Sequence, residues 1–201
     1  VTARTGKTHT KLYREEIERP ILIATDLSHS MLFGSKLLFK SVQASHIAAL
    51  IAWHAKARGD RVGGIVFNDL QHEEIKPRTR QKGVLQYLHA LSKIHQNSLT
   101  DWRNNRAENS DKFFEQNCMR LRQLAKPGSL IYLLSDIAYI TEEAVRQLVL
   151  ITQHCELVVC HITDPLEFDL PQVETKTNVA VTDGNVKQQL TLGDAKLASE
   201  Y

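Results

Sequence analysis

The chain lacks the features of a disulfide-stabilised protein. Its only three cysteines are Cys118, Cys155 and Cys160, and no two of them form a CxxC pair. An odd number of cysteines without such a motif is typical of reduced thiols in the cytosol. We therefore expect a cytoplasmic protein without disulfide bonds.

Strong charge of one sign and long apolar runs are also missing. The 25 basic and 23 acidic residues give a net charge of +2, which is too small to favour nucleic acid or an anionic membrane as a partner. No apolar segment approaches the roughly 20 residues of a membrane-spanning helix, and no signal peptide is visible. We expect no membrane contact from this segment. The chain begins at Val1 instead of methionine, so we also expect it to be a piece of a longer protein.

Apolar segments of the strand and helix types alternate along most of the chain. Uninterrupted apolar runs predict four buried strands, at 21–24, 61–68, 129–134 and 156–162. Apolar residues at helical spacing predict four helices, at 36–58, 81–94, 110–124 and 141–152. Strands without polar alternation are covered on both faces, so this order predicts an α/β fold. We expect a doubly wound, largely parallel sheet flanked by helices.

Helical spacing also predicts which side chains of three of these helices face the core. We expect the inward-facing residues to be Leu38, Val42, Ala49, Trp53, Phe113, Phe114, Met119, Leu121, Val145, Leu148 and Val149.

The remaining segments carry weaker signals. The polar segment 69–80 predicts a short extra strand or a hairpin, and 98–109 predicts a long loop because Trp102 is its only large apolar anchor. Segments 178–181 and 186–192 flank Asp183-Gly184, which is a strong hairpin signal. We further expect an edge strand at 8–13 and a terminal helix at 194–201.

These elements suggest three parts of the chain. Residues 1–19 form an N-terminal extension or edge strand, and residues 20–165 form the main α/β domain. Residues 166–201 form a C-terminal hairpin and helix packed on the same domain.

A carboxylate and two alternating hydroxyls follow the first strand, as Asp26, Ser28 and Ser30. Residues two apart can point the same way in an extended loop. One acid with neutral hydroxyls suits a hard divalent cation that keeps several waters. The alternative is that Asp26 caps a helix and that the serines form hydrogen-bonded turns.

A second strand, 129–134, ends in the same chemistry, at Ser135 and Asp136. In open α/β sheets, ligands bind beyond the carboxyl ends of the strands, where the strand order reverses. Two strands that end in an acid beside hydroxyls therefore favour a binding site at this edge.

Long segments of the sequence resemble the DUF58 family, which carries a von Willebrand factor type A-like domain. The segments are 19–31 (RPILIATDLSHSM), 40–67 and 127–136 (PGSLIYLLSD). The resemblance covers nearly the whole chain, including the DPLEFDLP segment at 164–171 and the TDGN turn at 182–185.

The resemblance implies a metal-ion-dependent adhesion site. Asp26, Ser28 and Ser30 match its first element, and Asp136 matches its last. The usual glycine-flanked threonine between them is missing here. Ser110, which opens the helix before the Asp136 strand, is the expected replacement. The rival is Thr100 in the preceding polar segment. The implied cofactor is Mg²⁺ or Mn²⁺, and a degenerate site without a metal is the alternative.

The implied function is binding rather than turnover. A partner's Asp or Glu would complete the coordination of the ion. Family members resemble accessory proteins encoded with MoxR-type AAA+ ATPases, so the resemblance implies an adaptor or scaffold in complex assembly or maturation.

The competing class is an enzyme. An acid at the end of the first strand is similar to the nucleophile of haloacid dehalogenase-type phosphatases. Those enzymes use D-x-D, and here Ser28 occupies the second acidic position. There is also no G-x-S-x-G motif of a serine hydrolase. We therefore expect no enzymatic activity, with a metal-dependent phosphatase-like hydrolase built on Asp26 as the alternative.

Overall fold

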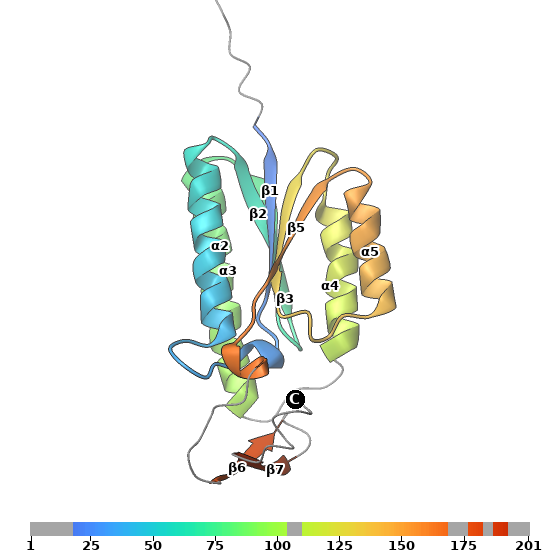
Figure 1. The fold of residues 1–201 in the computed structure, drawn as a ribbon. Helices are drawn as coiled ribbons and strands as arrows, with labels where there is room; N and C mark the ends of the chain where they lie inside the picture. Colours follow the sequence, from blue (N-terminus) through green and yellow to red (C-terminus); the bar gives the residue numbers. More distant parts are fainter. Residues whose placement is uncertain (1–17, 104–109, 169–176, 183–186, 193–201) are drawn as a thin grey trace, which may run out of the picture.

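A computed structural model describes residues 18–103, 110–168, 177–182 and 187–192 of the chain (Figure 1). Strands and helices alternate through most of this part. In chain order the elements are β1 (Pro20–Asp26), η1 (His29–Met31), α2 (Lys40–Ala57), β2 (Arg61–Phe67), β3 (His72–Arg78), α3 (Arg80–Arg103), α4 (Ser110–Leu124), β4 (Leu130–Ser135), α5 (Glu142–Thr152), β5 (Glu156–His161), η2 (Pro165–Glu167), β6 (Thr177–Thr182) and β7 (Lys187–Leu192).

The core of the fold is a five-stranded sheet in the order β3-β2-β1-β4-β5. β1 lies at the centre and pairs in parallel with β2 on one side and with β4 on the other. β4 and β5 are also parallel, whereas β3 runs antiparallel to β2. The predicted doubly wound, largely parallel sheet is confirmed.

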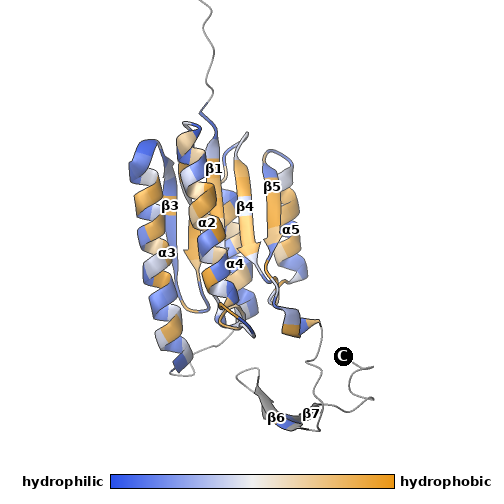
Figure 2. Cartoon of the chain, turned by 60° about the vertical axis from the view of Figure 1, so that its left-hand side comes forward, coloured by the Kyte–Doolittle hydropathy of each residue, from blue (hydrophilic) through white to orange (hydrophobic). Residues whose placement is uncertain are grey.

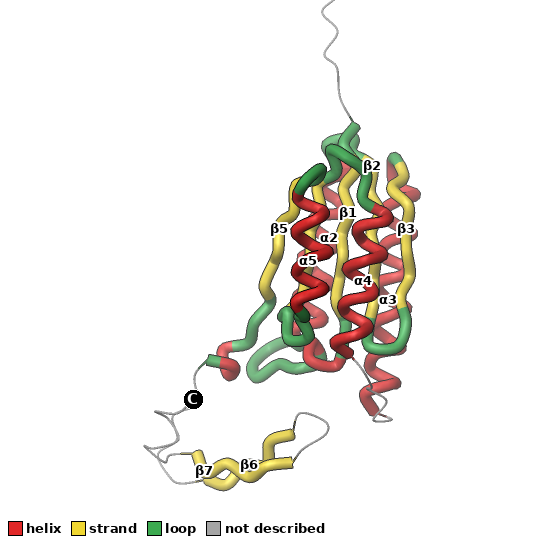
Figure 3. Tube along the Cα trace, turned by 90° about the vertical axis from the view of Figure 1, so that its right-hand side faces the viewer, coloured by secondary structure: helices red, strands yellow, loops and turns green. Residues whose placement is uncertain are grey.

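Helices cover both faces of this sheet. α2 and α3 lie against one face, and α4 and α5 lie against the other (Figures 1 and 3). Side chains that alternate along β1 enter the two cores in turn: Ile23 packs with the α2 side and Leu22 with the α4 side. This burial on both faces explains why β1 and β4 are uninterrupted apolar runs in Figure 2. None of the described helices combines the length and apolar character needed to cross a membrane.

The segment after β2 departs partly from the sequence prediction. β3 supplies the extra strand expected in 69–80. The loop expected at 98–109 is wrong for residues 98–103, which continue α3. Ser98 is buried and accepts a hydrogen bond from Asn68 Nδ2 at 3.0 Å, while Asn97 Nδ2 donates to Gln71 Oε1 at 3.0 Å. These contacts with the β2–β3 turn extend the helix beyond its apolar pattern.

The expected inward face of α2 is also wrong in part. Trp53 is 40% exposed and Leu38 lies outside the helix, 37% exposed. Small residues face the sheet instead, because they allow the helix backbone to approach it closely. The buried alanines of α2 are Ala44, Ala48, Ala52 and Ala55.

In α4 and α5 the prediction is right for some side chains and wrong for others. Phe114, Leu121 and Leu148 are buried as expected. Three of the expected core residues are instead well exposed, namely Met119, Val145 and Val149. Polar or small neighbours take the inward positions in their place, such as Asn117 in α4 and Ala144 in α5.

β5 was expected to be buried, but it is an edge strand. Within the described part of the chain it pairs only with β4. Val158 and Val159 are therefore 41% and 47% exposed. The expected hairpin is confirmed, since β6 and β7 pair antiparallel as a separate two-stranded sheet. The three cysteines are free thiols, as expected. The strand expected at 8–13 and the helix expected at 194–201 lie outside the described residues.

The pairing of β2 with β1 requires a glycine at Gly64. A Cβ atom at this position would collide with the backbone of Ile23 in β1. We expect Gly64→Ala to lower the free energy of unfolding by about 3 kcal/mol. As a control, Gly59→Ala meets no atom within 4 Å and suffers only its positive φ of 87°, so it should lose about 1 kcal/mol. Urea denaturation measures both, and equal losses would contradict the steric account.

Candidate functional site

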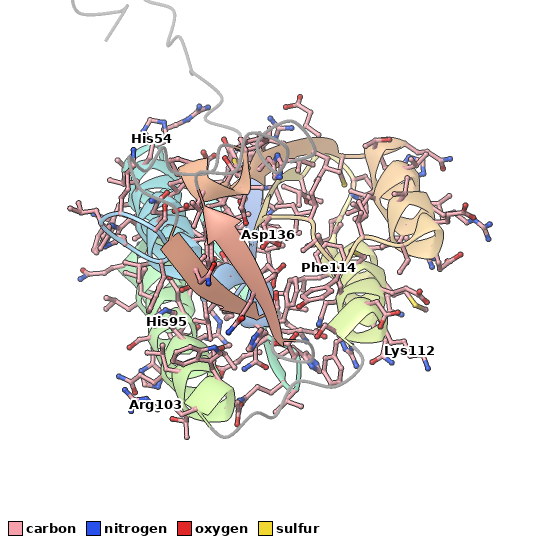
Figure 4. The ribbon with its side chains drawn as sticks, turned by 60° about the horizontal axis from the view of Figure 1, so that its bottom comes forward. His54, His95, Arg103, Lys112, Phe114 and Asp136 are labelled. Carbon is pink, nitrogen blue, oxygen red and sulfur yellow. The ribbon has the colours of Figure 1, made fainter. Side chains whose placement is uncertain are left out.

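The acid and hydroxyl residues meet where the strand order reverses. β1 ends at Asp26, β4 ends at Ser135, and Asp136 follows directly. The chain places β2 on one side of β1 and returns to the other side for β4, so the ends of β1 and β4 flank the switch point. Figure 4 looks onto this end and shows Asp136 between the helices of the two faces.

Asp26 is a buried anchor of this site. Only 1% of the surface of Asp26 is exposed. One carboxylate oxygen, Oδ1, accepts the backbone N–H of Ser28 at 2.9 Å, and the other, Oδ2, accepts the hydroxyl of Ser135 at 2.6 Å. The carboxylate therefore fixes the loop after β1 and ties it to the end of β4.

Burial also changes the acidity of Asp26. Desolvation raises the pKa of this carboxyl group from 3.8 to about 7, and the charge of Asp136 adds to the rise. The hydrogen bonds from Ser135 and Ser28 oppose it. Without a bound cation, Asp26 is therefore partly protonated near neutral pH.

Three further oxygens lie side by side in front of Asp26. Ser28 Oγ and Ser30 Oγ are 3.3 Å apart, and Ser30 Oγ donates to Asp136 Oδ1 at 3.1 Å. An octahedral Mg²⁺ with bonds of 2.0–2.1 Å has neighbouring ligand oxygens roughly 3 Å apart. These spacings fit adjacent positions around such an ion, so Ser28, Ser30 and Asp136 form a suitable set of ligands.

A lysine that the sequence did not single out completes the cluster. Lys40 Nζ lies 2.7 Å from Asp136 Oδ2 and also pairs with Glu167 of η2. Burial lowers the pKa of Lys40, but the hydrogen bonds and charges of Asp136 and Glu167 outweigh this effect and raise it overall. Lys40 is therefore a charged group inside the site. No local signal in the sequence identifies this residue, because Lys40 lies inside the helix predicted at 36–58 and its two partners are 96 and 127 residues away.

A third acid lies at the end of the neighbouring strand β2. Asp69 Oδ2 accepts the backbone N–H of His29 at 2.6 Å, while its Oδ1 is buried without a hydrogen-bond partner among the described residues. Burial and the charges of Asp69, Asp136 and Asp26 raise the pKa of Tyr139, although a hydrogen bond with Ser110 opposes the rise. The end of the sheet is therefore rich in negative charge. In the sequence, the predicted strand at 61–68 ends in Asn68 and is followed directly by Asp69. This order was the signal that could have identified the third acid.

The two candidates for the third hydroxyl have different surroundings. A hydrogen bond from Ser110 acts on the pKa of Tyr139, so Ser110 lies near this phenol, but no hydrogen bond in the described part of the chain joins it to Ser28, Ser30 or Asp136. Thr100 lies in α3 and donates to the carbonyl of Gln96 at 3.0 Å. The assignment of Ser110 stays a prediction. In the described ranges, no three His, Cys, Asp or Glu side chains form a metal-binding group, so an ion here depends on the serine hydroxyls.

Large apolar side chains surround this polar centre. We call the loops 27–39, 68–71, 136–141 and 162–168 the strand-end face. Leu37 is the most exposed of its apolar residues, at 90%. The turns at the opposite end of the sheet, 58–60, 126–129 and 153–155, expose no large apolar side chain. The large exposed apolar residues of the strand-end face are Phe33, Leu37, Leu38, Phe39, Leu70, Ile140 and Phe168.

The fold and the site together define a von Willebrand factor type A-like domain. The sheet order, with β3 antiparallel at one edge, and the D-x-S-x-S loop at the switch point are the defining features. The family model described as "Protein of unknown function DUF58" matches residues 1–199, and the chain belongs to this family.

Two solved structures of other proteins have a similar fold. One is an aerotolerance-related membrane protein from Bacteroides fragilis NCTC 9343, with 16% identity and a TM-score of 0.59, over 90% of this chain and 87% of that one. The other is the conserved hypothetical protein BatB from Bacteroides thetaiotaomicron, with 15% identity and a TM-score of 0.59, over 90% of this chain and 84% of that one. No curated protein sequence matches the chain.

The buried carboxyl group of Asp26 predicts a pH dependence of stability. Because its pKa is higher in the folded protein (about 7) than its ordinary value of 3.8, the folded state holds the proton more tightly. Stability should therefore fall as pH rises from about 4 to about 7, by about 4 kcal/mol at most. In Asp26→Asn the amide oxygen can accept from the Ser28 N–H and the NH₂ group can donate to Ser135 Oγ. Because this side chain has no charge, the variant should be more stable than the wild type at pH 8 and similar at pH 5.

Denaturant unfolding at pH 5 and pH 8, in the presence of a chelator, measures this difference. An equal loss of stability in Asp26→Asn and the wild type would show that Asp26 is not the group responsible.

Proposed function

We propose that this domain is a non-enzymatic adaptor that binds a protein partner through the strand-end face. The observation that carries the proposal is the gathering of exposed Phe, Leu and Ile side chains around the buried polar centre, which the described turns at the opposite end of the sheet lack. Large exposed apolar patches mark interaction sites more often than chance. A charged group at their centre gives such an interface its orientation and specificity.

The centre of the interface is proposed to hold Mg²⁺ or Mn²⁺. Ser28, Ser30 and Asp136 would hold the ion, and the spacing of their oxygens supports this choice. Ser110 is proposed as a further hydroxyl of the site. The ion supplies an electrophilic centre that accepts a carboxylate of the partner. Asp26 would hold the loop after β1 in place through its hydrogen bonds with Ser28 and Ser135.

The resemblance of the sequence to accessory proteins of MoxR-type AAA+ ATPases supports such an ATPase as the partner. The adaptor would then serve complex assembly or maturation. A domain that binds its partner without an ion is the second form of this proposal, and it keeps the same apolar surface.

The surroundings of Asp26 support binding over hydrolysis. A nucleophilic carboxylate must reach its substrate with a free oxygen. Both oxygens of Asp26 are engaged in hydrogen bonds, and the residue is 1% exposed. A phosphatase mechanism with Asp26 as nucleophile would require this anchor to break.

The ion predicts a pattern of hydroxyl mutants. Millimolar Mn²⁺ should raise the melting temperature of the wild type, because it binds only the folded state. Ser30→Ala should abolish the rise, since Ser30 Oγ lies between Ser28 Oγ and Asp136. Ser110→Ala should reduce it. Thr100→Ala is the control and should keep it, because its hydroxyl is bonded to Gln96.

Thermal melts with and without a chelator test this pattern. No effect of Mn²⁺ on the wild type would remove the ion from the proposal. A rise that is lost in Thr100→Ala and kept in Ser110→Ala would assign the third hydroxyl to Thr100.

The apolar surface predicts a second pair of mutants. Leu37→Asp places a charge in the strand-end face, and we expect it to weaken binding to a purified MoxR-type AAA+ ATPase roughly tenfold. Leu50→Asp is the matched control, because Leu50 is 71% exposed on α2, outside this face. Binding is measured by calorimetry in Mg²⁺. Equal losses in the two variants, or no loss in either, would count against the proposed surface.

A further inference from the structure

Lys40 occupies a position that the local backbone disfavours. It is the first residue of α2, where the positive end of the helix dipole repels a cation, and Phe39 before it offers no side-chain cap. The side chain of Lys40 is only 3% exposed, and buried lysines are rare in proteins unless they are paired. Neither helix formation nor solvation explains this residue. Its role must therefore lie with the groups that its ammonium contacts.

The ammonium group joins two carboxylates. Lys40 Nζ lies 2.7 Å from Asp136 Oδ2 and donates a second hydrogen bond to Glu167. The other oxygen of Asp136, Oδ1, accepts from Ser30 and belongs to the ligand set described above. A single carboxylate thus faces Lys40 with one oxygen and the proposed ion position with the other.

The segment that carries Glu167 is itself held in place. Asp164 Oδ2 accepts the backbone N–H of Ser35 at 2.9 Å, and Glu167 Oε2 accepts the backbone N–H of Asp164 at 2.9 Å. The turn η2 is therefore fixed to the loop before α2 by contacts that do not involve Lys40. The pair between Lys40 and Glu167 is part of a built arrangement.

We propose that Lys40 is the built-in cation of the strand-end site: it neutralises Asp136 in the ion-free protein and competes with a divalent ion for that carboxylate. This inference rests on the proposed function, because it concerns the ion of the same site. An ion on Asp136 Oδ1 adds two positive charges near the ammonium of Lys40. Repulsion between these charges lowers the affinity of the site for the ion. A partner's carboxylate offsets that repulsion, and the ion and the partner then bind cooperatively.

The test uses Mn²⁺ as the probe, with free Mn²⁺ measured by electron paramagnetic resonance. Lys40→Met keeps an extended side chain and removes the charge. We expect it to bind Mn²⁺ roughly tenfold more tightly than the wild type and to melt at a lower temperature in a chelator. Lys93→Met is the matched control, because Lys93 pairs with Glu73 at the surface, and it should bind Mn²⁺ like the wild type.

A second variant acts in the opposite direction and does not depend on the folding of Lys40→Met. Glu167→Gln removes one of the two negative charges beside Lys40, so Asp136 is the only carboxylate that remains paired with its ammonium. The pair between Lys40 and Asp136 then tightens, and Mn²⁺ should bind more weakly than to the wild type.

The outcomes separate this inference from the proposed function. Tighter binding by Lys40→Met together with weaker binding by Glu167→Gln supports it. Binding by Lys40→Met alone also supports it, while removing the ion from the wild-type function. Unchanged or weaker affinity in Lys40→Met, with Mn²⁺ bound by the wild type, overturns the role of Lys40 and leaves the adaptor proposal intact. If neither protein binds Mn²⁺, the ion and the competition are both overturned.

If Lys40→Met does not fold, weaker binding by Glu167→Gln supports the inference, and unchanged or tighter binding overturns it.

Discussion

The hydrogen bond between Ser135 and Asp26 is the contact on which the rest of the site depends. It joins the last residue of β4 to the last residue of β1 at the point where the strand order reverses. The second oxygen of Asp26 holds the amide of Ser28. Both oxygens of the carboxylate therefore serve to hold the loop in its conformation. Because the loop is fixed in this way, the hydroxyls of Ser28 and Ser30 lie beside Asp136 without further ordering.

The cost of this arrangement is electrostatic. Asp26 is the last residue of β1, and Asp69 and Asp136 lie just beyond the ends of its neighbours β2 and β4. All three acids raise the pKa of Tyr139. Such a concentration of buried negative charge requires compensation. The protein meets part of it by holding a proton on Asp26 and by placing Lys40 against Asp136. The acids that remain charged are the electrostatic basis of the proposed ion site, and the apolar rim is the basis of the proposed partner surface.

Much of this architecture could be predicted from the sequence, because buried parallel strands and the D-x-S-x-S loop leave local signals. The features that were missed depend on distant contacts. α3 continues to Arg103 because Asn68 and Gln71 bond its last turns. α2 is apolar on most sides, so its pattern could not show that alanines face the sheet. β5 has the composition of an interior strand although it lies at an edge. Lys40 reads as a surface residue until Asp136 and Glu167 are placed around it.

The sequence separation of the site's contacts has a consequence for how the protein folds. Asp26 and Ser135 are 109 residues apart, and Ser35 and Asp164 are 129 apart. Contacts of such range slow folding, because a long loop must close before they form. During synthesis the central strand β1 must wait, paired on one side only, until β4 has left the ribosome. The site therefore cannot form before β4 is available, and a chain truncated before Ser135 would not present it.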